Sequence, residues 1–586
     1  MRDGNDSIDS RGASLPPPLS PPNMRDGNDS IDSRGASLPP PWHSSFLPDW
    51  LARCAMNLPG HLAVQCGQVQ WNFAELDRQA TRLARQLATA GVQEGSRIAL
   101  LAGNGLSFIA FVHALIRLGA ILVPLNVRLT LEELCWQVQD MHAMLLVSDE
   151  RHAATATQIG QIFPGLLCAT LADNVGASGE WSGWEGLYWT QSGGLYGPPC
   201  LYPKKPTFAR SGEQISASAE TALNALPETN VPLRTLIDLS ATQAILYTSG
   251  TTGRPKGVLI TYGMQWWNAV GSALNLGHNP ADRWLACLPF FHIGGLAILM
   301  RSVIYGISVI VQEKFDAIAV NRAIYEDKVT IISVVAVMLQ RMLSALDTDT
   351  SYPSTLRCVL LGGGPAPRPL LEDCIHRGIP VVQTYGLTEA CSQAVTLAPA
   401  DALRKLGSAG RPLLPVQLRI MCDGQPASTG EPGEIFLKGP TITPGYVNRP
   451  DATAQVLHDG WLSTGDIGYL DDEGYLYVLD RRADLIVSGG ENVYPAEIEA
   501  ILLAHPDVEE AGVCRQPDPQ WGQVPIAFVH LRTGSAASTD DLIAYAMQHL
   551  ARYKLPRMIY LTDQLPRNSS GKLLRSELHR LLPTQR

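Results

Sequence analysis

The sequence predicts an α/β protein with a large N-terminal domain of doubly wound sheets, a small β-barrel subdomain and a small α+β domain at the C-terminal end. Strand and helix patterns alternate from residue 97 onwards, as they do in doubly wound sheets. Short β runs between Gly and Pro turns replace that alternation over 408–477, and mixed β and α patterns follow residue 485. The 586 residues suffice for two or more domains with a large core.

The first layer begins with a helix predicted over 73–90, because apolar residues recur there at helical spacing. The residues on its apolar face are Leu76, Ala80, Leu83 and Leu87. A strand over 97–101 and a helix over 106–118 come next. A strand over 120–124 follows, and residues 129–148 repeat the pattern. Strand, helix and strand in succession predict a parallel layer.

Two polar segments fall outside this pattern. Residues 1–18 recur unchanged as 24–41, and such a polar, Pro-rich duplication predicts a disordered segment over 1–41. Residues 174–230 are rich in Gly, Pro and Ser, which predicts an inserted, mostly disordered excursion. A partner-binding segment is the alternative there, anchored by Trp181, Trp184 and Trp189.

The stretch ILYTSGTTGRPKG over 245–257 predicts a loop that wraps phosphates. Its glycines let backbone N–H groups approach an anion, its hydroxyls add donors, and Lys256 adds positive charge. The candidate residues are Thr248, Ser249, Gly250, Thr251, Thr252, Gly253 and Lys256. The common nucleotide loop GxxxxGK(S/T) is absent, since Gly257 follows the lysine. A flexible linker is the alternative, but strand-like residues flank the loop on both sides.

Further strand ends carry residues suited to a ligand pocket. A strand predicted over 282–289 is followed by two phenylalanines and His292, and a helix over 296–305 carries Arg301 among apolar neighbours. A strand over 356–361 ends in a glycine turn, at the edge where open α/β sheets bind ligands. The glycines of this turn are Gly362, Gly363 and Gly364.

Two later motifs combine groups that a nucleotide needs. TYGLTE over 384–389 offers Tyr385 to stack on a base and Glu389 to help hold Mg²⁺ against phosphates. WLSTGD over 461–466 places Asp466 after a glycine turn, where a carboxylate can accept two hydrogen bonds from a ribose diol.

The last part of the chain predicts a small α+β domain. LIVSGGENVYP over 485–495 reads as a glycine-containing loop, and PRNSSGK over 566–572 presents Lys572 on a flexible turn. The elements between them are helices over 496–504 and 540–550 and strands over 511–514, 526–531 and 558–561.

The composition narrows the class of function. A formal net charge of −10 argues against a general nucleic-acid binder. The 11 cysteines are scattered without paired zinc-type spacing, which indicates a reducing compartment. Charged residues interrupt the long apolar stretches, and the N-terminus lacks a basic-then-apolar signal pattern. The sequence therefore predicts a cytoplasmic protein without stable membrane insertion.

With these pieces in place, the chain resembles the acyl-adenylate-forming (AMP-binding) superfamily of acyl- and aryl-CoA ligases, luciferases and peptide-synthetase adenylation domains. The motifs TSGTTGRPKG, TYGLTE, STGD, DRRAD with SGGEN, and PRNSSGK stand in the family's order. The chain is most similar to the o-succinylbenzoate–CoA ligases of menaquinone biosynthesis, as in LPFFHIGGLAILMRSVIYG over 288–306. The resemblance implies an N-terminal adenylate-forming domain over 42–480 and a mobile C-terminal lid domain over 481–586.

The resemblance also implies two half-reactions and a cofactor set of ATP, Mg²⁺ and CoA. A carboxylate attacks the α-phosphorus of ATP to give an acyl-adenylate and pyrophosphate, and the CoA thiol then displaces AMP. The residues implied for the β- and γ-phosphates are Thr248, Ser249, Gly250, Thr251, Thr252, Gly253 and Lys256. Those implied for the rest of the nucleotide are Gly363, Gly364 and Tyr385 for adenine, Gly386 beside them for cofactor binding, Thr388 for the α-phosphate, Glu389 for Mg²⁺, and Asp466 and Arg481 for the ribose. Gly489 and Gly490 are implied for the second half-reaction, and Lys572 is implied to bridge the attacking carboxylate and the α-phosphate.

Three positions carry more specific expectations. His292 resembles the family residue that gates the acyl site, with a structural histidine as the alternative. Arg301 is expected to hold the ring carboxylate of o-succinylbenzoate, with an arginine paired to a core carboxylate as the alternative. Ala483 stands at the hinge, where the family usually has Asp or Lys, so a side-chain role there is in doubt.

Other functions stay open at this point. A general aryl- or medium-chain acyl-CoA ligase is the nearest alternative, and an adenylation enzyme that loads a carrier protein is more distant. A degenerate nucleotide-binding scaffold is opposed by the joint presence of Lys256, Glu389, Asp466, Arg481 and Lys572. Small-molecule partners are expected throughout, and a homo-oligomer is expected by family analogy.

Overall fold

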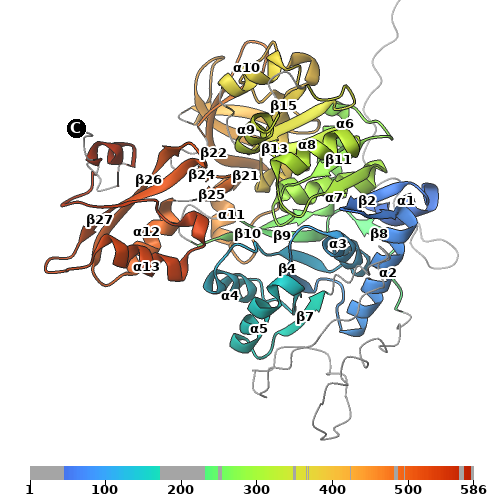
Figure 1. The fold of residues 1–586 in the computed structure, drawn as a ribbon, viewed down its shortest axis with the longest axis horizontal. Coiled ribbons are helices and arrows are strands. Elements are labelled where there is room, and N and C mark those ends of the chain that lie inside the picture. Colours follow the sequence, from blue (N-terminus) through green and yellow to red (C-terminus); the bar gives the residue numbers. More distant parts are fainter. Residues whose placement is uncertain are drawn as a thin grey trace, which may run out of the picture. The chain divides into compact units, whose positions relative to one another are not determined.

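The structure is a computed structural model that describes residues 45–171, 231–248, 254–346, 351–363, 366, 368–422, 424–480, 486–493, 495–566, 573 and 575–582. The described elements belong to one compact unit, Ser45–Arg586. The duplicated segment over 1–41 lies outside the described residues, and so does the predicted insertion over 174–230. Figure 1 labels the elements along the chain.

The first sheet confirms the predicted parallel layer. Its strands stand in the order β10-β9-β5-β4-β6-β7, and all neighbours are parallel except β10 and β9. The strands are β4 (Arg97–Leu101), β5 (Ile121–Pro124), β6 (Leu145–Asp149), β7 (Leu167–Leu171), β9 (Thr242–Thr248) and β10 (Lys256–Thr261). The helices that alternate with them are α2 (Phe73–Thr89), α3 (Leu106–Leu118), α4 (Leu131–Asp140) and α5 (Ala153–Ile162).

Helix α2 shows how local sequence sets these elements. The Asn72 side chain accepts a hydrogen bond from the N–H of Glu75, and the Glu75 carboxylate accepts one from the N–H of Asn72, which closes a capping box. The predicted apolar face, Leu76, Ala80, Leu83 and Leu87, is buried. Cap and apolar stripe together explain why this helix begins at Phe73 and packs against α3.

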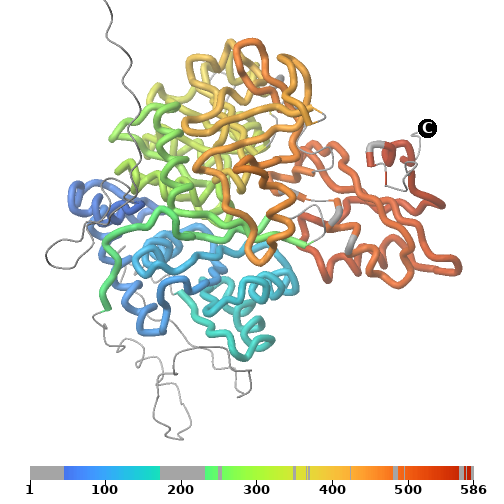
Figure 2. The backbone as a smooth tube through the Cα atoms, turned by 180° about the vertical axis from the view of Figure 1, so that it is seen from behind, coloured from blue at the N-terminus to red at the C-terminus, as the bar shows by residue number. Residues whose placement is uncertain are grey.

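The second sheet has nine strands in the order β17-β16-β15-β14-β13-β11-β12-β2-β3. They are β2 (Leu62–Cys66), β3 (Val69–Asn72), β11 (Arg283–Ala286), β12 (Ser308–Val311), β13 (Ile331–Val335), β14 (Cys358–Gly362), β15 (Val381–Leu387), β16 (Ser392–Thr396) and β17 (Arg411–Pro412). The helices of this part are α1 (Trp50–Asn57), α6 (Tyr262–Leu276), α7 (Ile293–Tyr305), α8 (Ala317–Glu326), α9 (Ala336–Ser344) and α10 (Arg368–His376). Because β2 and β3 join this sheet, the blue start of the described chain lies beside green segments in Figure 2.

One boundary in this part of the chain differs from the prediction, and one motif lies partly inside a strand. Helix α7 begins at Ile293 rather than at residue 296, so two glycines predicted to lie before the helix are its first-turn residues. A Cβ on Gly295 would lie 2.2 Å from the carbonyl oxygen of Pro289, so only glycine lets the helix start this close to the turn. The TYGLTE motif, which the sequence analysis placed in no element, begins inside a strand, because β15 runs on to Leu387.

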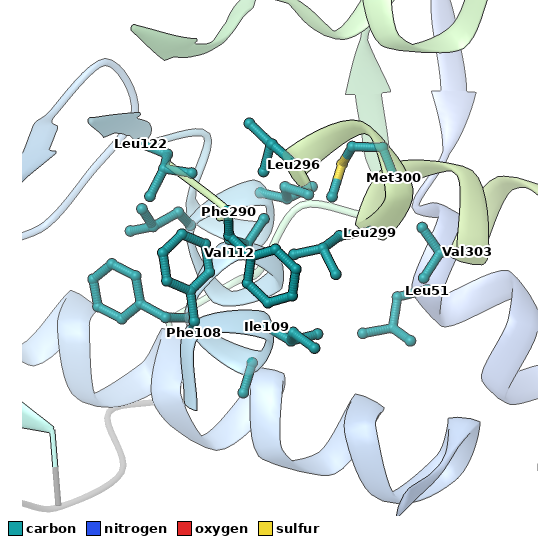
Figure 3. Packing of buried hydrophobic residues seen from close by; sticks show 14 of the residues in the cluster. Leu51, Phe108, Ile109, Val112, Leu122, Phe290, Leu296, Leu299, Met300 and Val303 are labelled. Carbon is teal, nitrogen blue, oxygen red and sulfur yellow. The ribbon is translucent and has the colours of Figure 1, made fainter. Parts of the chain in front are cut away.

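A large apolar core joins the two sheets and holds α7 in place. Phe108 of α3 and Phe290, just before α7, have ring centroids 5.3 Å apart. Leu299 and Val303 of α7 belong to the same cluster, and Figure 3 shows Val303 beside Leu51. This packing fixes the helix that carries His292 at its N-cap and Arg301 in its last turns.

The predicted β subdomain is an antiparallel sheet in the order β19-β18-β20-β22-β21, with β23 paired to β22. Its strands are β18 (Gln417–Cys422), β19 (Gln425–Pro426), β20 (Gly433–Lys438), β21 (Leu457–His458), β22 (Trp461–Leu470) and β23 (Leu476–Asp480), with α11 (Pro450–Val456) before β21. A separate two-stranded sheet pairs β1 (Phe46–Pro48) with β8 (Leu236–Asp238).

The C-terminal part is the predicted small α+β domain. Its sheet has the order β25-β24-β27-β26, with β28 beside β27. The elements are β24 (Ile486–Ser488), β25 (Glu491–Val493), α12 (Pro495–Ala504), β26 (Val508–Asp518), β27 (Gly522–Leu531), α13 (Thr539–His549) and β28 (Ile559–Leu561). None of the helices in the described parts of the chain has the length and apolar character that a membrane span requires.

The loop predicted over 485–495 is instead a tight hairpin. Ser488 pairs with Glu491, and Gly489 and Gly490 form the turn with φ of 59° and 88°. A two-residue hairpin turn of this kind needs positive φ at both central residues, which glycine adopts without strain. The paired glycines therefore make a β-turn rather than an irregular loop.

Candidate active site

A cavity of about 210 Å³ opens where the second sheet, α7 and the β24–β25 hairpin meet. Its wall brings together residues as far apart in the sequence as Arg128 and Glu491, which are 363 positions apart. The predicted site residues on this wall are His292, Arg301, Gly363, Gly386, Thr388, Gly489 and Gly490. The structure thus collects residues predicted for the acyl site, for the nucleotide and for the glycine hairpin around one space.

His292 meets a carboxylate that the sequence analysis did not single out. Its Nε2 lies 3.0 Å from Oε2 of Glu491, and Arg128 donates to the other oxygen, Oε1. Burial raises the pKa of the Glu491 carboxyl. The combined attraction of His292 and Arg128 is the larger effect and holds that pKa below its usual value. Position in the SGGEN motif was the one available signal for Glu491.

Arg301 is a buried cation without a carboxylate partner in the described parts of the chain. Arg301 is 2% exposed, and its Nη2 donates a hydrogen bond to Oδ1 of Asn268 at 2.5 Å. The guanidinium carbon lies 5.4 Å from the ring centroid of Trp284, and Nε finds no hydrogen-bond partner among the described residues. Burial lowers the pKa of this guanidinium. The alternative of an arginine paired with a core carboxylate finds no such carboxylate among the described residues.

A second, smaller pocket of about 80 Å³ adjoins the glycine turn after β14. Gly363, Tyr385 and Gly386 line it, together with Gly407 and Ala409 from the loop before β17. The Tyr385 hydroxyl donates to Oδ2 of Asp466 at 2.7 Å, across 81 positions of sequence. Asp466 is 5% exposed. The structure therefore places the residues predicted for adenine beside the carboxylate predicted for the ribose.

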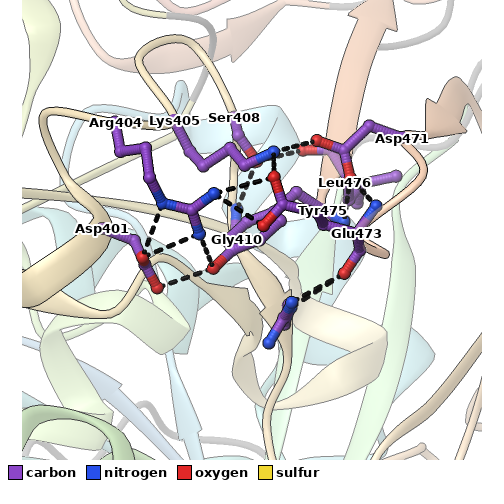
Figure 4. Close-up of polar contacts among 10 residues, drawn as sticks. Asp401, Arg404, Lys405, Ser408, Gly410, Asp471, Glu473, Tyr475 and Leu476 are labelled. Atoms are coloured by element: carbon purple, nitrogen blue, oxygen red, sulfur yellow. Dashed lines mark hydrogen bonds and ion pairs between the residues drawn. The ribbon is translucent and has the colours of Figure 1, made fainter.

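An ionic network, drawn in Figure 4, stabilises one wall of that second pocket. The Lys405 ammonium lies 2.7 Å from Oδ2 of Asp471 and 2.5 Å from Oε1 of Glu473. Tyr475 accepts a hydrogen bond from Arg404 at 2.9 Å. These contacts tie the start of the loop that carries Gly407 to the β22–β23 turn, and so fix one wall of the pocket.

The residues predicted for phosphates and Mg²⁺ also converge. The Lys256 ammonium lies 5.2 Å from the ring centroid of Tyr446, whose hydroxyl donates to Oε1 of Glu389 at 2.9 Å. Thr248 is the cross-strand partner of Lys256 in the β9–β10 ladder. The sequence analysis missed Tyr446, which links the predicted phosphate cation to the predicted metal ligand.

Magnesium fits this arrangement through a single protein carboxylate. In the described part of the chain, no group of three or more His, Cys, Asp or Glu residues could hold a metal ion by itself. Mg²⁺ commonly binds through one or two carboxylates together with substrate phosphates. Glu389, beside Lys256 and Tyr446, meets that requirement.

Several predicted residues lie outside the described residues. They are Ser249, Gly250, Thr251, Thr252, Gly253, Gly364, Arg481, Ala483 and Lys572.

A buried lysine joins the C-terminal domain to α4. Lys554 is 3% exposed, and its Nζ lies 2.6 Å from Oε1 of Glu133 and 2.7 Å from Oε1 of Glu497. Burial disfavours its charge, but the two carboxylates outweigh burial and raise the pKa of Lys554. Asn126 donates to the hydroxyl of Tyr553 at 3.3 Å in the same contact. No sequence motif had marked these residues.

Comparison with protein families gives two matches. The AMP-binding enzyme family matches residues 51–447, and the AMP-binding enzyme C-terminal domain matches residues 497–572. The first match alone covers more than half of the chain. The chain therefore belongs to the AMP-binding enzyme family, and the predicted resemblance to acyl-adenylate-forming enzymes is confirmed.

Several relatives at 42–50% identity carry the same activity name, 2-succinylbenzoate–CoA ligase. The 2-succinylbenzoate–CoA ligase of Geobacillus kaustophilus (strain HTA426) is 50% identical over 537 residues, which are 92% of this chain and 98% of the relative. A double mutant of o-succinylbenzoate CoA synthetase from Bacillus subtilis, solved with its product analogue OSB-NCoA, is 39% identical with a TM-score of 0.77. That match covers 91% of this chain and 99% of the other, and it confirms the predicted fold and subgroup.

The same Bacillus subtilis enzyme is similar in two further complexes. With the acyl-adenylate intermediate OSB-AMP it is 40% identical with a TM-score of 0.63, over 91% of this chain and 98% of the other. With ATP and magnesium ion it is 39% identical with a TM-score of 0.62, over 91% of this chain and 100% of the other. The present structure is thus more similar to the product-analogue complex than to the ATP and adenylate complexes.

Proposed function

We propose that this chain is an ATP-dependent acid–CoA ligase that converts 2-succinylbenzoate, ATP and CoA to 2-succinylbenzoyl-CoA, AMP and pyrophosphate in menaquinone biosynthesis. The 50% identity to a ligase of this name, over nearly the whole of both chains, supports the reaction class. The observation that carries the substrate is the buried Arg301 guanidinium on the cavity wall, which has no carboxylate partner among the described residues.

The first half-reaction needs positioning and charge neutralisation more than a strong base. A carboxylate is already ionised at neutral pH, so it can attack the α-phosphorus of ATP directly. Thr248, Lys256 and the glycine-rich residues between them hold the departing β- and γ-phosphates, and Glu389 holds Mg²⁺. When bound, Mg²⁺ neutralises charge on the phosphate oxygens.

The remaining residues orient the reacting groups. Thr388 contacts the α-phosphate, and Lys572 bridges that phosphate and the attacking carboxylate. Asp466 and Arg481 hold the ribose hydroxyls. In support, Asp466 is buried and already accepts a hydrogen bond from Tyr385 of the smaller pocket.

The second half-reaction takes place at the glycine hairpin. Gly489 and Gly490 lack side chains and line the acyl cavity, so the hairpin leaves room for a thiol to approach the acyl carbon. His292, which we propose gates this site, is held by the Glu491 carboxylate of the same hairpin. Contact of the hairpin with the cavity, and the higher similarity to the product-analogue complex, support this assignment. Ala483, the proposed hinge residue, contributes torsional freedom rather than a side-chain contact.

Arg301 selects the acid. 2-Succinylbenzoate has two carboxylates, of which the succinyl carboxylate is activated. The ring carboxylate pairs with Arg301, directly or through a water molecule, and this pairing compensates the buried charge of the guanidinium.

The free thiols support the proposed cellular location, and the substrates define the proposed partners. Every cysteine in the described part of the chain is a free thiol, which supports a reducing, cytoplasmic location. The partners are small molecules, namely an acid, ATP and CoA, and the chain works without nucleic acid or stable membrane insertion. A homo-oligomer is proposed by family analogy, and sedimentation of the purified protein tests it.

A panel of acids tests the proposed function. AMP release with CoA as acceptor is measured for 2-succinylbenzoate, benzoate and octanoate. We expect strong turnover of 2-succinylbenzoate alone. Turnover of benzoate or octanoate without 2-succinylbenzoate would instead identify a general acyl-CoA ligase.

A further inference from the structure

Beside Arg301 lies a buried amide to which neither the motifs nor the proposed mechanism gives a role. Asn268 of α6 is 2% exposed, and its Oδ1 accepts the hydrogen bond from Nη2 of Arg301 at 2.5 Å. Its Nδ2 donates to the main-chain carbonyl of Gln393 at 2.7 Å. Gln393 belongs to β16 and lines the cavity. Asn268 therefore ties the guanidinium to the cavity wall across two elements.

The other neighbour of the guanidinium is also uncharged. The Trp284 ring lies 5.4 Å from the guanidinium carbon, and its Nε1 donates to Oγ of Ser333 at 3.0 Å, which fixes the ring. An amide oxygen and an aromatic face both attract a cation without neutralising it. The cation is thus oriented on two sides, and the described part of the chain offers no carboxylate to compensate its charge.

We propose that Asn268 is a positioning residue that sets the selectivity of the enzyme for a dicarboxylic acid. It holds Arg301 toward the cavity and, as an uncharged acceptor, leaves the full positive charge for the second carboxylate of the substrate. A carboxylate at position 268 would form an internal ion pair with Arg301 and remove that preference. The inference rests on the proposed function, since an acid with two carboxylates must enter the cavity.

The test compares two acids that differ only in the second carboxylate. 3-Benzoylpropionate keeps the succinyl carboxylate and the ketone of 2-succinylbenzoate and lacks the ring carboxylate. We expect the Asn268→Asp variant to lose about 10- to 100-fold of kcat/KM for 2-succinylbenzoate, through KM. Its kcat/KM for 3-benzoylpropionate should stay within about threefold of the original enzyme.

A matched control separates selectivity from general damage. Asn321 of α8 is 5% exposed, and its Nδ2 donates to the Met342 carbonyl at 2.9 Å, away from the cavity wall. Asn321→Asp makes the same chemical change in a buried site, and should leave the preference between the two acids unchanged. Thermal unfolding of both variants shows how much stability each change removes.

Asn268→Asp places a carboxylate oxygen against the Gln393 carbonyl oxygen, and this repulsion can prevent folding. A second variant covers that case. Asn268→Ala removes the acceptor without adding charge, and we expect a smaller loss, about tenfold, for 2-succinylbenzoate only. In an Arg301→Leu background, Asn268→Asp should change the preference no further, because Asn268 acts through Arg301.

The outcomes distinguish the two proposals. If the original enzyme turns over 2-succinylbenzoate but a folded Asn268 variant keeps its preference, the positioning role is wrong and the function stands. Equal losses for both acids, matched by Asn321→Asp, would likewise show a purely structural asparagine. If the original enzyme does not turn over 2-succinylbenzoate, both proposals fail together.

Discussion

Two buried charges at the acyl cavity, Arg301 and Glu491, have different surroundings. Glu491 accepts hydrogen bonds from two cationic or ionisable side chains, His292 and Arg128, which keep it ionised. Arg301 contacts an amide and an aromatic ring and has no carboxylate partner among the described residues. A buried charge is costly unless it is paired, and this cost supports the proposal that a substrate carboxylate pairs with Arg301.

His113 gives a prediction about stability against pH. It lies inside α3, and burial lowers its pKa from 6.5 to about 4. The unfolded chain binds a proton near pH 6.5 that the folded chain does not bind until about pH 4, so stability falls as the pH drops through this window. At low pH this effect costs the original protein about 3 kcal/mol of unfolding free energy, and His113→Leu should remove that cost. The unfolding free energy from urea titrations should then depend less on pH in the variant. Parallel curves for the two proteins would contradict the buried neutral histidine.

Glu389 gives a prediction about magnesium. Glu389→Gln keeps the acceptor for the Tyr446 hydroxyl but removes the charge, so kcat should fall about 10²- to 10³-fold. The Mg²⁺ concentration for half-maximal rate should rise, while the thermal midpoint stays near that of the original protein. Glu431→Gln, at an exposed carboxylate that accepts from the Ser428 N–H, is the control. An unchanged Mg²⁺ requirement in Glu389→Gln would remove Glu389 from the metal site.

At the scale of elements, short turns and helix starts place the site. The Gly489–Gly490 turn brings Glu491 to His292, and the close approach at Gly295 lets α7 begin directly after His292. Both details differ from the predicted loop and the predicted helix start. Local composition predicted a glycine-containing loop at the right place. The pairing of Ser488 with Glu491 makes this loop the turn of a hairpin.

The loop before β17 gives a prediction at this scale. Lys405→Met should raise the KM for ATP about tenfold, because the loop that carries Gly407 loses its tie to Asp471 and Glu473. The KM for the acid should change less, since the acyl cavity has other walls. Initial rates against ATP concentration measure the effect. Lys438→Met is the control. Lys438 of β20 lies in the sheet that also contains β22 and β23, and it contacts the Asp459 carbonyl and not this loop. Equal KM values in both variants would show that the ionic network only stabilises the fold.

At the scale of the whole molecule, the contact at Lys554 links the C-terminal domain to α4. Its carboxylates come from Glu133 of α4 and Glu497 of α12. The structure is also more similar to a relative's complex with a CoA product analogue than to complexes with ATP or acyl-adenylate. We infer that this contact stabilises the arrangement used in the second half-reaction.

Glu133→Gln tests this inference. The variant keeps the oxygen that caps α4 at Thr130 but weakens the buried ion pair, so transfer of the acyl group to CoA should slow about tenfold. Pyrophosphate formation in the absence of CoA should keep its rate. Rapid-quench measurements of both half-reactions separate the two effects. Glu75→Gln is the control, because Glu75 caps α2 in the same way and its ion pair with Arg78 is partly exposed. An equal loss in both half-reactions would contradict a role specific to the CoA step.

The sequence by itself determined the fold class and the family, and it supplied most residues of the proposed nucleotide site. Those features depend on residues close together in the chain, such as the apolar face of α2 or the TYGLTE motif, so periodicity and composition reveal them. Only the tertiary structure decided which side chains meet. Asn268 and Arg301 are 33 positions apart, and Asn268 and Gln393 are 125 apart. Such contacts follow from how helices pack on the sheet, and no local pattern encodes that packing.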